Sequence, residues 1–194
     1  MIPTFIVLSS QIFSISIYSG ITQSKLHGQD FIYRHSQQTR NGFKLGIEFK
    51  KPIIQDLSFT YGAGISSRGA KIKIKSSTYQ AKRWHLYYID FPVLLQYDFR
   101  KKFLNLGNLY VKHGLKVSYL FASFKEEFNG LDKTVGSSVI EHQKKEALSL
   151  LFITGLNRGK LSYEVTFNLG LRGIGGGKQD IKDRSFDFIL KKEF

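Results

Sequence analysis

The residues that could do chemistry are few, and their spacing does not suit it. Residues 173–178 read GIGGGK, which is similar to a phosphate-binding loop. The spacing is one residue short, and Gln179 stands where such a loop needs a serine or threonine for magnesium. No helix is expected to follow. The segment is therefore predicted to be an external loop.

Metal and nucleophile chemistry have no better support. The five histidines lack the spacing of a metal site, and the chain contains no cysteine that could supply a thiolate. No G-x-S-x-G motif is present to hold a nucleophilic serine. We therefore expect no catalytic residues, no metal and no cofactor, and predict that the protein is not an enzyme.

The clearest chemical feature of the chain is its charge. It has 29 Lys and Arg residues against 15 Asp and Glu, a formal net charge of +14. Such an excess suits nucleic acid, an anionic membrane surface or solvated loops. Nucleic acid is not an expected partner, because no aromatic residues interleave with the basic ones as single-strand binding requires.

A regular alternation of side chains must position these charges. In residues 87–99, YYIDFPVLLQYDF, one set of alternate side chains is apolar or aromatic, whereas the other includes acids and an amide. Successive side chains of a strand point to opposite faces, so this is one long strand with an apolar and a polar face. The pattern recurs in seven further segments, which begin near residues 13, 43, 57, 109, 148, 161 and 186. The sequence thus predicts eight strands and an all-β fold.

The length and content of these strands indicate which face meets water. A strand of 13 residues, at about 3.3 Å per residue and a tilt of roughly 40°, rises about 33 Å and crosses the ~25 Å apolar band of an outer membrane. The polar face is rich in small residues, such as Gly62 and Gly64, which suit the narrow interior of a small barrel. It also carries charges, which are costly against lipid. The polar face is therefore predicted to line the lumen.

These arguments predict an eight-stranded antiparallel up-and-down transmembrane β-barrel. Eight strands leave an interior just wide enough for side chains to fill, so we expect a closed lumen and functional extracellular loops. Charges of both signs should pair across this interior, because an unpaired buried charge is costly. The predicted lumen charge network consists of Lys44, Glu48, Asp90, Asp98, Lys112, Lys116, Glu164 and Arg172.

The connections between the strands alternate between long and short, as in outer-membrane barrels. The long ones are predicted at about 24–41, 69–84, 123–146 and 175–184. In RGAKIKIK, residues 68–75, lysines occupy the alternate positions that hold apolar residues earlier in the same strand. The strand therefore either bulges near Gly69 or projects above the bilayer. The predicted basic rim, which is either a solvated hairpin or a contact for lipopolysaccharide phosphates, consists of Arg68, Lys71, Lys73, Lys75, Lys82 and Arg83.

Three segments together resemble a known family: YIDFPVLLQYDF, LYVKHGLKVSYLF and LLFITGLNRGKLSYEVTFNLGLRGI. They are similar to the outer-membrane β-barrel domain family of the PorT type, from Bacteroidetes-like Gram-negative bacteria. The best marker is Asp90 with Pro92, followed by an aliphatic run and Tyr97. The resemblance implies an integral outer-membrane protein, expected as a monomer in outer-membrane lipid, with a structural or interaction role or an accessory role in secretion beside secretion components.

The two ends of the sequence add further expectations. The last strand resembles the signal read by the barrel-assembly machinery, carried here by Phe186, Phe188 and Phe194. Residues 1–12 are predicted to be a signal-peptide remnant, although no Lys or Arg precedes the apolar run; the alternative is a first strand that begins early. Residues 13–194 are predicted to form the barrel domain. The alternative from another class is a soluble lipocalin-like barrel that binds an apolar ligand.

Overall fold

The fold is described from a computed structural model of the 194-residue chain. The structure describes residues 13–27, 35–74, 80–103, 107–129, 132–137, 145–173 and 182–194. Ten strands in these ranges join in one sheet. Over the same ranges no helix is long and apolar enough to cross a membrane.

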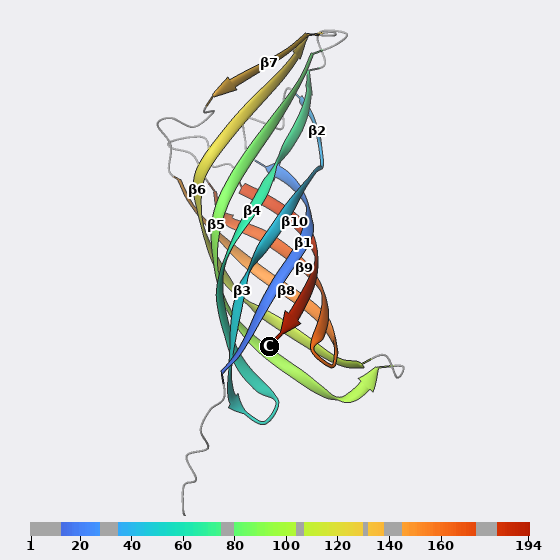
Figure 1. The fold of residues 1–194 in the computed structure, drawn as a ribbon. Helices are drawn as coiled ribbons and strands as arrows, with labels where there is room; N and C mark the ends of the chain where they lie inside the picture. The colour runs from blue at the N-terminus through green and yellow to red at the C-terminus, as the bar shows by residue number, and fades with distance from the viewer. Residues whose placement is uncertain are drawn as a thin grey trace, which may run out of the picture.

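Eight of the strands close into a barrel, as their pairing shows (Figure 1). Each is antiparallel to its neighbours, and the first pairs with the last, so the ring has no open edge. The barrel strands are β1 (Ser14–His27), β3 (Arg40–Ile54), β4 (Leu57–Ile74), β5 (Gln80–Phe103), β6 (Gly107–Asn129), β8 (Glu146–Arg158), β9 (Leu161–Arg172) and β10 (Lys182–Glu193). The predicted eight-stranded antiparallel barrel is confirmed.

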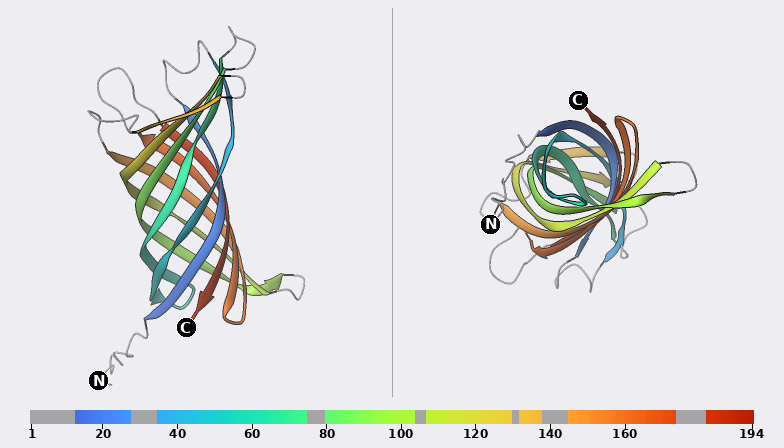
Figure 2. Two further views of the ribbon diagram at one scale, coloured as in Figure 1. Left: turned by 45° about the horizontal axis from the view of Figure 1, so that its top comes forward. Right: turned by 90° about the horizontal axis from the view of Figure 1, so that it is seen from below.

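The barrel is taller on one side than on the other. Strands β4, β5 and β6 have 18, 24 and 23 residues and rise past the rest to form a wall (Figures 1 and 2). Two short strands extend it: β2 (His35–Gln38) pairs with β4, and β7 (Asp132–Ser137) pairs with β6. We call these projecting parts the tall wall, the end of the barrel that carries it the loop end, and the opposite end the turn end.

The tall wall corrects two of the predicted long loops. Much of 69–84 and 123–146 is strand, because the β4–β5 and β5–β6 hairpins keep their pairing beyond the barrel. The β4–β5 register runs unbroken from the Gly64–Asp90 pair to the Lys73–Ala81 pair. No bulge therefore lies at Gly69 in this hairpin, and the strand projects upward instead.

The outer face of the barrel is apolar. On β5, exposed Phe91, Val93 and Leu95 alternate with buried Leu94 and Gln96. Similar outward rows lie on the other barrel strands, with exposed Ile17, Leu45, Ile47, Leu115, Val117, Phe152, Val165 and Phe188. Soluble monomers rarely expose so large a continuous apolar surface. The face that would be hidden in a soluble protein is turned outward here.

Aromatic side chains mark both ends of this apolar face. Near the loop end, Tyr87 lies 6.4, 6.3 and 5.9 Å from the ring centres of Phe43, Phe121 and Phe124, and we call these four residues the upper aromatic cluster. Near the turn end, Tyr97 and Phe99 have ring centres 5.2 Å apart. From Tyr87 to Tyr97 the strand rises about 25 Å at roughly 3.3 Å per residue and a tilt near 40°. That height matches the apolar band of an outer membrane with its aromatic girdles.

Single cysteines test this assignment of faces. Cysteines at Phe91, Val93 and Leu95 are expected to be protected from water-soluble thiol reagents and to crosslink to lipid-borne probes. Cysteines at Asp90 and Gln96 are expected to receive no lipid probe, because their side chains point into the lumen. Labelling of the Gln96 position but not the Val93 position by the lipid probe would contradict the assignment.

Candidate functional site

The barrel interior holds a cluster of four charges near the turn end, here called the lower cluster. Lys112 on β6 and Lys191 on β10 lie between Glu48 on β3 and Glu164 on β9. The Lys112 Nζ is 2.7 Å from Glu48 Oε1 and 2.8 Å from Glu164 Oε1, and the Lys191 Nζ is 2.9 Å from each of these oxygens. The Tyr110 hydroxyl donates to Glu164 Oε1 at 2.7 Å. Charges of alternating sign thus join four strands across the lumen.

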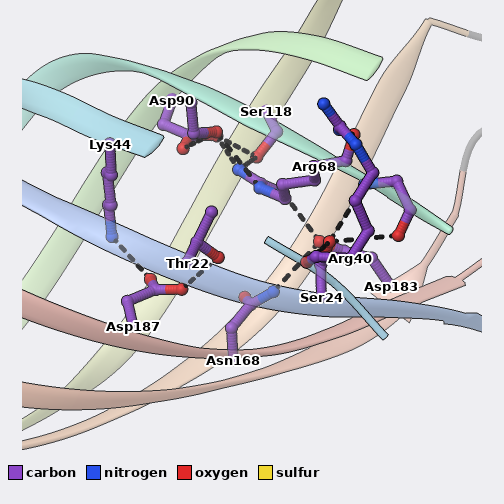
Figure 3. Close-up of polar contacts among 12 residues, drawn as sticks. Thr22, Ser24, Arg40, Lys44, Arg68, Asp90, Ser118, Asn168, Asp183 and Asp187 are labelled. Atoms are coloured by element: carbon purple, nitrogen blue, oxygen red, sulfur yellow. Dashed lines mark hydrogen bonds and ion pairs between the residues drawn. The ribbon is translucent and has the colours of Figure 1, made fainter. Parts of the chain in front are cut away.

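A second group, the upper cluster, lies nearer the loop end and is centred on Arg68 of β4 (Figure 3). The Arg68 guanidinium donates to Asp90 and, at 2.8 Å, to Asp183 Oδ2. Two hydroxyl groups also donate to Asp90: Ser66 Oγ at 2.7 Å and Ser118 Oγ at 2.6 Å. Arg68 therefore ties β4 to β5 on one side and to β10 on the other.

A separate ion pair completes the upper cluster. The Lys44 Nζ is 3.1 Å from Asp187 Oδ2, and the Thr22 hydroxyl donates to Asp187 Oδ1 at 2.6 Å (Figure 3). Lys116 is buried on β6 beneath Ser118. The cluster thus contains as many cations as carboxylates: Lys44, Arg68 and Lys116 against Asp90, Asp183 and Asp187. Such a balance is expected inside a barrel, because a buried charge without a counter-charge is costly.

Apolar side chains separate and cover the two clusters. Leu94, Leu151 and Ile153 form a buried layer. A cavity of about 20 Å³ lies beside this layer, lined also by Lys44 of the upper cluster and Glu48 of the lower one. Such a volume has room for about one water molecule. Toward the loop end lies a second buried apolar layer of Leu26, Ala70, Leu86, Tyr88, Leu120 and Ala147, with Trp84 packed against it.

Glycines make room for the largest lumen side chains. A Cβ atom at Gly155 would meet the ring of Tyr110, and one at Gly46 or Gly64 would meet the hydroxyl of Tyr18. Tyr110 therefore packs against β8, and Tyr18 reaches past β3 to β4, at points where the facing strand has no side chain. The small residues of the polar face thus serve to fill the lumen more completely with tyrosine rings.

Most of the predicted lumen charges lie in these clusters. Of the eight, six are buried in the interior: Lys44, Glu48, Asp90, Lys112, Lys116 and Glu164. Asp98 lies apart, at the turn end, where it pairs with Lys50 at 2.8 Å and is partly exposed.

Arg172 is the exception, because its side chain is exposed and outside the network. Opposite it, the register of β8 and β9 shifts: Leu148 pairs with Arg172, but Ser149 pairs with Gly170. The extra residue, Leu171, changes the phase of the strand end. Simple alternation therefore assigned Arg172 to the wrong face.

The predicted basic rim is also corrected at Arg68, which lies in the upper cluster. Since β4 has no bulge at Gly69, Arg68 keeps the inward phase of Ser66. Lys71 and Arg83 do lie on the outside of the tall wall, as direct cross-strand partners. Lys75 and the side chains of Lys73 and Lys82 lie outside the described part of the structure.

Four members of the clusters are absent from the predicted lumen network: Arg68, which was predicted in the basic rim, and Asp183, Asp187 and Lys191. Asp187 and Lys191 share the polar phase of the last strand, so alternation alone indicates both. Asp183 lies within the predicted loop 175–184, but β10 begins at Lys182 and not near residue 186. Nothing in the sequence marks it as the partner of Arg68.

The residues predicted as an assembly signal lie on the outside of the barrel. Phe186, Phe188 and Phe194 are exposed by 51%, 54% and 63%. The N–H of Phe194 donates to the carbonyl of Ile15 at 2.9 Å.

His113 also points outward, opposite Leu95 on the neighbouring strand. Among the described residues, no group of three or more potential ligand side chains could hold a metal ion. The proposed signal peptide, residues 1–12, lies outside the described residues.

The closed ring, the outward apolar band and the buried charges of the lumen together define an integral outer-membrane β-barrel. A family model described as outer membrane protein beta-barrel domain matches residues 9–175, and the chain belongs to this family. The protein is therefore located in the outer membrane. A search of curated proteins gave no match.

Two solved structures share the fold. Neisserial surface protein A has a TM-score of 0.50 at 13% identity, covering 95% of this chain and 100% of its own. OprG from Pseudomonas aeruginosa has a TM-score of 0.51 at 12% identity, covering 95% and 97%. A soluble lipocalin-like barrel is not favoured, because such a protein would turn its apolar face inward toward the ligand, whereas here this face is outside.

Proposed function

We propose that this outer-membrane barrel is a non-enzymatic, monomeric protein with a closed lumen, which acts through its loop end on other molecules. Its role is that of a structural or interaction protein, with the PorT-type role of an accessory factor in secretion as the more specific form. The observation that carries this proposal is the filled interior, whose cavity of about 20 Å³ lies between two clusters of ion pairs. Since a closed barrel cannot conduct, its function lies at the loop end or on the outer wall.

The layered interior supports a closed lumen. A hydrated ion moving along the axis would have to pass the apolar layer around Leu94 and then separate the pairs between Lys112 and the two glutamates. Both steps are costly, because the pairs would lose their partners while still buried. Water-filled channels are found in barrels of about sixteen strands or more.

The tall wall supports an interaction role at the loop end. It continues a paired sheet past the apolar band and carries exposed side chains beyond that band, such as Val135, which is exposed by 61%. A rigid sheet presents such side chains with less conformational entropy to lose on binding than a mobile loop. The PorT-type role rests on the sequence resemblance alone. Recognition by the barrel-assembly machinery is supported by the exposed row of Phe186, Phe188 and Phe194.

Conductance measurements test the proposal. Purified protein reconstituted into planar lipid bilayers is expected to show no stable conductance of porin size, whereas a trimeric porin treated identically gives regular steps. Enlarging Gly62 or Gly64 should change nothing in such a recording. Steady channels that become narrower in these variants would contradict a closed lumen and make transport the leading function.

A further inference from the structure

The outer face of the tall wall carries a group of cations just beyond the upper aromatic cluster. We propose that Lys71, Arg83 and Arg40 form a binding site for a phosphate group of lipopolysaccharide, the phosphorylated glycolipid of the outer leaflet. This inference goes beyond the proposed function, since it concerns the lipid around the barrel and not a partner of its loop end.

The first observation is an unfavourable pair of like charges. Lys71 and Arg83 are direct cross-strand partners on β4 and β5, and both take the outward phase. Like charges in this position destabilise a strand pair. Glu126 offsets them weakly, because its Oε2 is 4.0 Å from the Arg83 guanidinium. An anion bound between the two cations would turn this repulsion into attraction, and the bidentate geometry of arginine suits phosphate.

The second observation is a fixed arginine whose hydrogen bonds all go to neutral groups. Arg40 donates to the Arg68 carbonyl at 2.6 Å and to Ser67 Oγ at 3.4 Å, and its other terminal nitrogen lies 2.6 Å from His85 Nδ1. Since Nδ1 accepts from Arg40, the proton of a neutral His85 is on Nε2, which lies 3.4 Å from Glu126. These contacts hold Arg40 in place without neutralising its charge, and Glu126, the carboxylate beside Arg83, attracts Arg40 as well. The two arginines therefore share this carboxylate.

The third observation is the height of the site. The upper aromatic cluster marks the outer interface of the membrane, where aromatic girdles lie. Phe124 of this cluster is the cross-strand partner of His85, and Arg83 is the next outward position on β5. The cations are therefore at the level of the lipid headgroups, where phosphates are abundant.

An apolar groove beneath the cations selects a lipid over free phosphate. It has a volume of about 490 Å³ on the lipid-facing wall of β1, β3, β4 and β5, where the small side chain of Ala63 leaves a depression. Its lining includes Ile17, Leu45, Ile47, Ile65 and Ile89. From Ile89 to Arg83 the strand covers about 20 Å at roughly 3.3 Å per residue. An acyl chain attached to a phosphate-bearing sugar at Arg83 can therefore lie in this groove.

The test measures retention of lipid A by the full chain in native mass spectrometry, with dephosphorylated lipid A as the competing probe. The double variant Lys71→Gln/Arg83→Gln is expected to lose about thirtyfold in affinity for the phosphorylated form. It removes two surface cations, each of which contributes a similar free energy of attraction to an anionic headgroup. The matched control, Arg158→Gln/Lys160→Gln, removes the same charge from exposed positions at the turn end and should bind as the wild type does. The charge-removal variants should remain folded, and Lys71→Gln should slightly raise the unfolding midpoint in lipid-free detergent by relieving the repulsion.

A variant that fills the groove distinguishes binding of the acyl chain from binding of the phosphate. Ala63→Phe is expected to weaken binding of lipid A while leaving binding of a short-chain phosphorylated sugar unchanged. Equal retention of phosphorylated and dephosphorylated lipid A would overturn the proposal. So would an equal loss in the turn-end control, which would indicate general charge attraction, or displacement of the lipid by inorganic phosphate alone, which would indicate a simple anion site.

Discussion

Replacing Lys112 with methionine is expected to lower the free energy of unfolding by about 3–5 kcal/mol. The side chain is fully buried and is the direct partner of both Glu48 and Glu164. Its removal leaves two carboxylates with only Lys191 between them, beside a cavity with room for about one water molecule. Urea titration of the protein in lipid vesicles, followed by the gel shift between folded and unfolded bands, measures the change.

A second substitution identifies the cause of this loss. Adding Glu48→Gln to Lys112→Met restores equal numbers of opposite charges in the lower cluster, so most of the lost stability should return. Lys160→Met, at an exposed turn position, serves as the matched control and is expected to change stability by less than about 0.5 kcal/mol. Additive losses in the double variant would show that the charges do not act as one cluster.

Replacing Arg68 with methionine is expected to have a similar cost of about 3–5 kcal/mol, because it leaves the buried Asp90 and Asp183 without the guanidinium that joins them. Arg172→Met is the informative comparison. Alternation alone assigns Arg172 to the lumen and Arg68 to the rim, whereas the structure reverses both positions. The Arg172 variant should therefore stay within about 0.5 kcal/mol of the wild type in the same urea titration.

A large loss in Arg172→Met with none in Arg68→Met would contradict the phases that the structure gives to β4 and β9. Losses of equal size in both variants would indicate that arginine removal acts through the net charge of the protein. The folded fraction of each variant before titration must be measured, so that a failure to assemble is not counted as lower stability.

The barrel could be predicted from the sequence because every strand follows the same alternation of side chains. Side chains alternate between lipid and lumen over the full membrane height, and residues such as Phe91 and Asp90 show their facing without any knowledge of their neighbours. The rule fails where the pairing becomes irregular. The single extra residue, Leu171, reverses the phase of the strand beyond it, and no residue type at this point indicates the shift in register.

The partners of the lumen charges could not be predicted from the sequence. Glu48 and Lys112 lie on β3 and β6, which are not adjacent in the ring, and they meet only because the strands are tilted and staggered by particular amounts. The height of the tall wall escaped prediction for a related reason. Above the membrane, alternation no longer separates lipid from lumen, so paired strand and polar loop have similar compositions there.

The pairing of β1 with β10 constrains how the barrel can be made. These strands meet over the whole range from Ser16–Glu193 to His27–Lys182, although most of the chain separates them. Until they do, Lys191 cannot reach Glu48, and Asp187 cannot reach Lys44. A half-built sheet would therefore enter the bilayer with uncompensated charges on its concave side, a state disfavoured by several kcal/mol per charge. Insertion and closure must then occur as one cooperative event, late in assembly and slow because of its long-range contacts. A catalyst for this event would have to shield the unpaired edges of β1 and β10 until the two strands can join.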